Sequence, residues 1–280
     1  MVATRLVRIA ERVLPEVPGP LITPIAEVLG TVAYAVSPTA RAAVQANLEM
    51  IAPKRATRRT TRHVFVEQSR NYLDIFRLPR TDPAKIRASV EKRGWERFVQ
   101  AHEQGKGVIL ASAHLGPISL VGQIIVAHGY ATVLPVETER SEVQRAVNRG
   151  RAALGIHVVR ADTPLAVVRA LRRGNVFGLL ADRAITGVGE RVPFFGRETL
   201  LPSAHIVLGL RTGAPVLPAF SLHEGTTLVA SFEPALQLVA TGDREADVRA
   251  GMLQWAAVLE RYIQRAPEQW TVFERVWSAL

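Results

Sequence analysis

His114 is the residue of this sequence best placed for acid–base chemistry. It follows an apolar run, Gly107–Ala113, that is typical of a buried strand, and the chain turns at once through Gly116 and Pro117. Ligands usually bind at the carboxyl ends of strands in an open α/β sheet, and an imidazole exchanges a proton near neutral pH. The pattern makes His114 a candidate general base. A histidine at a strand end can also be purely structural.

A second polar segment begins where another apolar run, Val176–Ala181, ends. The charged residues that follow it are Asp182, Arg183, Glu190 and Arg191. We expect them to occupy a polar loop with an apolar plug at Phe194–Gly196, close to any site built around His114. The alternative is a surface loop held by its own ion pairs.

Strands and helices are expected to alternate along most of the chain. The predicted strands are Gly107–Ala113, Ala131–Pro135, His157–Val159, Val176–Ala181, Pro215–Phe220 and Thr227–Phe232. The predicted helices are Leu120–His128, Ser141–Leu154, Thr163–Arg173, Ser203–Arg211 and Asp243–Arg265. This order predicts an α/β domain with a mostly parallel central sheet covered by helices on both faces.

The first 36 residues form a different kind of segment. One face of the predicted first helix is apolar and another is basic; the apolar residues are Leu6, Ile9 and Val13, and the basic ones are Arg5, Arg8 and Arg12. No signal-peptide pattern is present. The next apolar run, Leu21–Val36, is interrupted by Pro24 and Glu27 and is shorter than the roughly 20 residues of a spanning helix. We expect an interfacial or re-entrant helix, with a plain core helix as the alternative, and divide the chain into residues 1–36 and 37–280.

Composition narrows the choice of partner and chemistry. The sequence of 280 residues is 48% hydrophobic and contains no cysteine, which excludes thiolate nucleophiles, disulfides and zinc–thiolate sites. Its net charge of +10 indicates a polyanionic partner: anionic lipid headgroups, a nucleotide-containing substrate or nucleic acid. Aromatic residues make up only 6% of the sequence and are not interleaved with basic residues as is typical of nucleic-acid binding, so we expect no nucleic-acid partner. We also expect no metal site. Dinucleotide, Walker and serine-hydrolase patterns are also missing.

Seven features occur in an order that resembles one family of bacterial acyltransferases. They are Arg41 with Asn47-Leu48, His114-Leu-Gly, Arg151-Ala-Ala-Leu-Gly155, Asp182-Arg183 with Phe194-Phe195-Gly196, Pro202, Thr212-Gly-Ala-Pro215 with Pro218, and Pro267-Glu-Gln-Trp270. The family includes the late acyltransferases of lipid A biosynthesis and the phosphatidylinositol mannoside acyltransferases of actinobacteria. The resemblance covers nearly the whole chain and implies a glycerolphosphate-acyltransferase-like fold.

The resemblance also implies an activity. The protein would act at the cytoplasmic face of the cell membrane, moving a fatty acyl group from acyl-CoA or acyl carrier protein to a hydroxyl of a glycolipid or lysophospholipid. His114 would be the general base, with no cofactor beyond the acyl donor. Arg151 and Arg183 would hold the oxyanion or the anionic headgroup, although either could be a structural ion-pair partner. The other expected substrate-binding residues are Ser119, Asp182 and Arg191.

One position departs from the family pattern. The family has an acidic residue five positions after the histidine, whereas this chain has Ser119, whose neutral hydroxyl cannot offset an imidazolium charge. Another carboxylate can take that role, and Glu190 is the predicted one, although Arg191 occupies the position where the family's loop glutamate is expected. Alternatively, the enzyme is slower or works on an unusual acceptor, or the protein is catalytically silent and binds lipid or acyl thioester.

Overall fold

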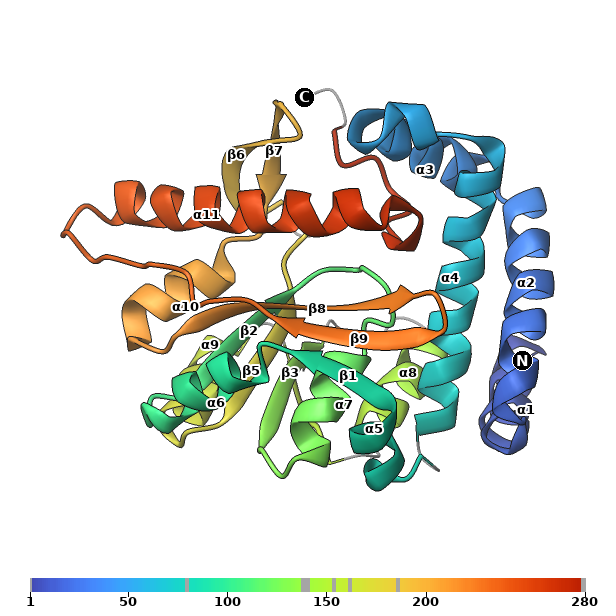
Figure 1. Cartoon of the computed structure of the whole chain (residues 1–280), viewed down its shortest axis with the longest axis horizontal. Helices are drawn as coiled ribbons and strands as arrows, with labels where there is room; N and C mark the ends of the chain where they lie inside the picture. The colour runs from blue at the N-terminus through green and yellow to red at the C-terminus, as the bar shows by residue number, and fades with distance from the viewer. Residues whose placement is uncertain are drawn as a thin grey trace.

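A seven-stranded, mostly parallel sheet forms the centre of the molecule (Figure 1). The computed structural model describes residues 2–78, 81–136, 142–152, 155–160, 163–184 and 187–277; within them, the side chains of residues 2–6, 8, 143 and 151 are not described. The strands are β1 (Val90–Arg93), β2 (Val108–Ser112), β3 (Thr132–Val136), β4 (His157–Arg160), β5 (Val176–Leu180), β8 (Val216–Glu224) and β9 (Thr227–Phe232), in the order β1-β9-β8-β2-β5-β3-β4. The block from β8 to β4 is parallel, and β9 and β1 run in the opposite direction.

Helices cover both faces of the sheet because β2, its central strand, is apolar on both sides. Val108 and Leu110 pack with one core cluster, whereas Ile109 and Ala111 pack with the other. The first face carries α5 (Pro83–Ser89), α6 (Trp95–Glu103) and α7 (Leu120–Ala127). The second carries α9 (Pro164–Arg172), α10 (Ala204–Thr212) and α11 (Arg244–Arg265), while α8 (Glu142–Ala152) lies beside β4. The predicted fold class and all six predicted strands are therefore confirmed.

The amino-terminal helices form a layer at one end of the sheet, along the right of Figure 1. They are α1 (Val2–Val13), α2 (Gly19–Val36), α3 (Pro38–Ile51) and α4 (Arg58–Arg77). Ile22 and Ala26 of α2 pack against α4, and a Cβ atom added at Gly30 would lie 2.5 Å from the Cα atom of Val66. The opposite face of α2 is exposed and apolar, with Leu21, Val28, Leu29, Val32 and Val36. Within the described residues, α2 is the one helix long and apolar enough to cross a membrane by length and composition.

Two regions differ from the sequence prediction. Residues 83–103 form α5, β1 and α6, for which we predicted no element. The expected polar loop before Gly196 is instead an antiparallel hairpin of β6 (Glu190–Phe194) and β7 (Arg197–Leu201). Buried Val192 and Phe194 alternate with exposed residues, which is the period of a half-buried strand, and the turn takes positive φ at Phe195 and Gly196.

Candidate active site

Neighbouring strands bring His114 and Asp182 together at one edge of the sheet. β2 and β5 are paired in parallel with Ser112 opposite Leu180, and the pairing continues through the hydrogen bond from the Ala181 amide to the Ser112 carbonyl. His114 and Asp182 are each the second residue beyond those partners. Parallel register therefore places the two side chains at equivalent positions past the carboxyl ends of their strands.

Asp182 is fully buried and receives three hydrogen bonds. Its Oδ1 atom lies 2.8 Å from Nδ1 of His114, and its Oδ2 atom accepts from the His114 backbone amide and from Nε1 of Trp270, both at 2.9 Å. Burial alone would raise the pKa of Asp182, but the nearby His114 charge and these donors outweigh it and hold the pKa below its ordinary value. Asp182 is therefore an ionised acceptor inside the protein.

The ionised carboxylate determines which nitrogen of His114 is available for chemistry. A carboxylate only accepts hydrogen bonds, so Nδ1 of His114 carries the proton and donates to Asp182. The lone pair of the neutral imidazole then lies on Nε2, for which no hydrogen bond is found among the described residues. The His114 side chain is 18% exposed, so this nitrogen belongs to a group that solvent reaches. An imidazole held in one tautomer in this way is able to act as a general base.

The carboxyl-terminal segment braces both members of the pair. Besides the Trp270 contact to Asp182, the Thr271 amide donates to the His114 carbonyl at 2.7 Å, and the Gly116 amide donates to the Gln269 carbonyl at 2.9 Å. Asn47 of α3 fixes the next part of this segment through its side-chain contacts to the backbone of residues 272, 274 and 276. Gly116 has φ of 59°, and a Cβ atom there would lie 2.2 Å from the Ser221 carbonyl oxygen, so the turn after His114 requires glycine.

Glu190, the carboxylate predicted to orient the histidine, has a different partner. It lies in β6 and its nearest cation is Arg249 of α11, at 3.5 Å. Arg191 follows it in the hairpin with an exposed side chain, and its carbonyl accepts from Arg249 at 2.8 Å. The structure thus places Asp182, which we had assigned to substrate binding, in the position beside His114 that the sequence analysis gave to Glu190.

The remaining predicted residues have no described contact with His114. Arg183 forms an ion pair with Glu274, which is the structural alternative that the sequence left open. Ser119 occupies the position before α7, and its Oγ atom is buried with no hydrogen-bond partner among the described residues. Arg151 lies in α8, but its side chain is outside the described part of the structure.

Sequence reasoning gave no role to Trp270. The segment Pro267-Glu-Gln-Trp270 was recognised only as a shared family feature, and a single buried tryptophan is normally a core residue. Its indole N–H needs an acceptor when buried, which was the one available signal. The described residues contain no cluster of three or more His, Asp or Glu side chains that could hold a metal ion.

Comparison with known proteins shows which sequences this chain is similar to. Residues 2–279 match the sequence family described as "Bacterial lipid A biosynthesis acyltransferase". A phosphatidylinositol mannoside acyltransferase of Mycobacterium tuberculosis is 29% identical over 219 residues, covering 75% of this chain and 67% of that protein. A protein of the same name from Mycolicibacterium smegmatis is 26% identical over 217 residues, covering 75% of this chain and 70% of its own length.

Proposed function

Because the chain belongs to the bacterial lipid A biosynthesis acyltransferase family, and is thus an acyltransferase of lipid biosynthesis, we propose that it acylates a hydroxyl of a membrane glycolipid or lysophospholipid. The donor in this proposal is the thioester of acyl-CoA or acyl carrier protein. The two mycobacterial relatives are named for acylating phosphatidylinositol mannosides. A mannose hydroxyl of such a lipid is therefore the first acceptor to test.

The proposed reaction uses His114 as base and then as acid. Nε2 of His114 takes the proton of the acceptor hydroxyl while its oxygen attacks the thioester carbonyl. The ionised Asp182 stabilises the resulting imidazolium through Nδ1. When the tetrahedral intermediate collapses, the new oxygen ester forms, the carbon–sulfur bond breaks, and His114 returns the proton to the leaving thiolate.

The negative charge of the intermediate and of the substrates needs cationic partners. Arg151 and Arg183 have this role in the proposal. Arg183 must first exchange its contact with Glu274 for a contact with the substrate. Ser119, with a buried and unpaired Oγ atom, is proposed to contact the acceptor or the donor. Glu190 and Arg191 lie on the β6–β7 hairpin, so they would contact the substrate only where this hairpin does.

The proposal places the enzyme at the cytoplasmic face of the membrane, where its acyl donors occur. The exposed face of α2 supports membrane association, because one side of this helix is packed on α4 and the other presents an apolar stripe. The net charge of +10 adds attraction to anionic lipids. In this arrangement α2 lies along the surface of the bilayer.

The His114–Asp182 pair is the observation that carries the proposal, and turnover is its test. Purified protein is incubated with labelled acyl-CoA or acyl carrier protein and detergent-dispersed acceptor lipids, and acylated products are identified by mass spectrometry. We expect His114→Ala to lower the rate by about 10²–10⁴-fold, the usual contribution of a general base. His157→Ala, which changes an exposed histidine on β4, is the matched control and should retain the wild-type rate. A His114→Ala variant with most of the wild-type rate would exclude His114 as the base.

A further inference from the structure

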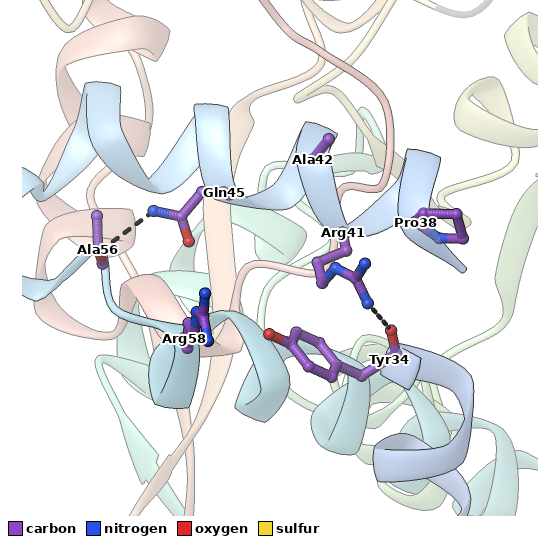
Figure 2. Close-up of a pocket in the computed structure, with 7 residues that line it drawn as sticks. All are labelled: Tyr34, Pro38, Arg41, Ala42, Gln45, Ala56 and Arg58. Atoms are coloured by element: carbon purple, nitrogen blue, oxygen red, sulfur yellow. Dashed lines mark hydrogen bonds between the residues drawn. The ribbon is translucent and has the colours of Figure 1, made fainter. Parts of the chain in front are cut away.

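A pocket of about 430 Å³ lies at the corner where α2, α3 and the start of α4 meet. The residues that line it are Tyr34, Pro38, Arg41, Ala42, Gln45, Ala56 and Arg58. Figure 2 shows Arg41 and Arg58 entering the same space from two different helices, with the Tyr34 ring between them. None of these residues belongs to the His114–Asp182 pair or to the segment that braces it.

The pocket is cationic, and the described residues that line it include no carboxylate. Arg41 donates from Nη1 to the Tyr34 carbonyl at 2.9 Å, and its guanidinium carbon lies 5.2 Å from the centre of the Tyr34 ring. These contacts hold the guanidinium in place while its other N–H groups remain able to donate. Arg58 is exposed, and no ion pair to it is found in the described residues. Two guanidinium groups around one cavity match the oxygens of a phosphate, which arginine binds through paired N–H donors.

The location of the pocket indicates where that phosphate comes from. It lies at the carboxyl end of α2, where its lining residues Tyr34 and Pro38 are two positions before and after Val36, the last residue of the exposed apolar stripe, whose exposed fraction is 71%. If the stripe enters the acyl region of a bilayer, the pocket is at the depth of the lipid headgroups. Tyr34 suits the same depth because its ring is apolar and its hydroxyl is polar.

We propose that the pocket formed by Tyr34, Arg41 and Arg58 binds the phosphate of an anionic membrane lipid and so orients the enzyme on the bilayer. This inference rests on the membrane association in the proposed function, but it concerns an anchoring site separate from the catalytic pair. The bound lipid holds α2 flat on the membrane. The edge of the sheet that carries His114 then keeps a constant position relative to the lipid surface.

Vesicle binding without an acyl donor tests the site. The full chain is mixed with vesicles of phosphatidylcholine alone, phosphatidylcholine with phosphatidylglycerol, and phosphatidylcholine with oleate at the same surface charge, and the bound fraction is measured by flotation. We expect the wild type to prefer the phosphatidylglycerol vesicles over the oleate ones. The double variant Arg41→Gln with Arg58→Gln should lose that preference. Its binding to phosphatidylglycerol vesicles should weaken by roughly 30-fold, because each arginine near an anionic surface contributes about fivefold.

Two controls separate the pocket from general surface charge. Arg172→Gln with Arg173→Gln removes the same charge from exposed positions at the end of α9, on the other side of the molecule from α2 (Figure 1), and should weaken binding less than about threefold. Arg58→Gln alone, which breaks no described hydrogen bond, should weaken binding about fivefold without changing the thermal unfolding temperature.

Three results would overturn the proposal. The first is an equal loss of binding in the two double variants, and the second is equal binding of the wild type to oleate and phosphatidylglycerol vesicles. The third is calorimetric binding of soluble glycerol 3-phosphate at the pocket as tight as vesicle binding, because the site would then serve a soluble phosphate compound. Turnover of the wild type with detergent-dispersed acceptor is measured separately, so a failed anchoring site is distinguishable from a failed acyltransferase assignment.

Discussion

Replacing Asp182 by asparagine tests the mechanism with the smallest change of shape. Oδ2 of Asp182 accepts two donors, the His114 backbone amide and Trp270 Nε1, whereas the partner of Oδ1 among the described residues is His114 Nδ1. An asparagine therefore satisfies every partner in one orientation. Its oxygen takes the place of Oδ2, and its amide nitrogen donates to Nδ1. The opposite orientation would direct an NH₂ group at two N–H donors.

The satisfied orientation inactivates His114 by changing its tautomer. Once Nδ1 accepts a hydrogen bond, the neutral ring carries its proton on Nε2, which can no longer take the proton of the acceptor hydroxyl. The variant also loses the negative charge that stabilises the imidazolium. We expect kcat to fall by about 10³–10⁴-fold, or roughly 4 kcal/mol or more of transition-state stabilisation. Every donor that Asp182 accepts keeps a partner, but one N–H of the new buried amide has no described acceptor, so we expect a fold that is retained and destabilised by about 1–3 kcal/mol.

The assay follows release of free coenzyme A from acyl-CoA in the presence of acceptor, together with thermal unfolding of each variant. Asp247→Asn is the matched control. Asp247 lies in the first turn of α11, is also buried and accepts two hydrogen bonds from Thr241. The Asp247→Asn variant should keep the wild-type kcat. An Asp182→Asn variant with more than a tenth of wild-type kcat would refute the tautomer argument. One that fails to fold would refute the hydrogen-bond argument. If Glu190→Gln lowers kcat as much as Asp182→Asn does, Glu190 has the role that the sequence analysis predicted.

Two further predictions follow from buried rings. Trp270→Phe removes one hydrogen-bond donor to Asp182, so the pKa of that carboxyl should rise and kcat should fall about tenfold. The acidic limb of the kcat–pH profile should move to higher pH. If Trp270 only fills space, this limb will stay in place. His205 is fully buried, and burial lowers its pKa to about 3, so between pH 6.5 and 3 the unfolded state binds a proton that the folded state does not. The free energy of unfolding should therefore fall as the pH is lowered, with a loss of about 2 kcal/mol at pH 5 from this residue. Denaturant unfolding of His205→Phe should not show that loss. A variant that still shows it would contradict a neutral His205.

The sequence predicted the parallel part of the fold because its strands are short apolar runs bounded by glycine or proline. Such runs must be buried on both faces, and β2 and β5 were recognised for that reason. β1 was missed because three of its four residues, Glu91 to Arg93, are charged, as an edge strand tolerates. The β6–β7 hairpin was missed because Pro193 and the charged residues concealed its alternation.

The His114–Asp182 pair could be predicted as two separate residues but not as a pair. His114 and Asp182 were both placed at strand ends. Their contact depends on β2 and β5 being neighbours, which local patterns do not reveal because helices and two other strands lie between them in the chain. Trp270 was harder still, since its contact to Asp182 spans 88 residues and involves no regular element of its own. Long-range contacts of irregular segments leave no periodic signal in the sequence.

The brace formed by residues 269–271 also affects when the enzyme becomes competent during its synthesis. His114 and Asp182 leave the ribosome long before Trp270, and the contact from Thr271 to His114 closes a separation of 157 residues. A nascent chain can therefore pair β2 with β5 before Thr271 contacts the backbone of His114 and before Trp270 donates to Asp182. If His114 and Asp182 carry out acyl transfer as proposed, the fully supported site forms only after the segment around Trp270 has docked onto the sheet.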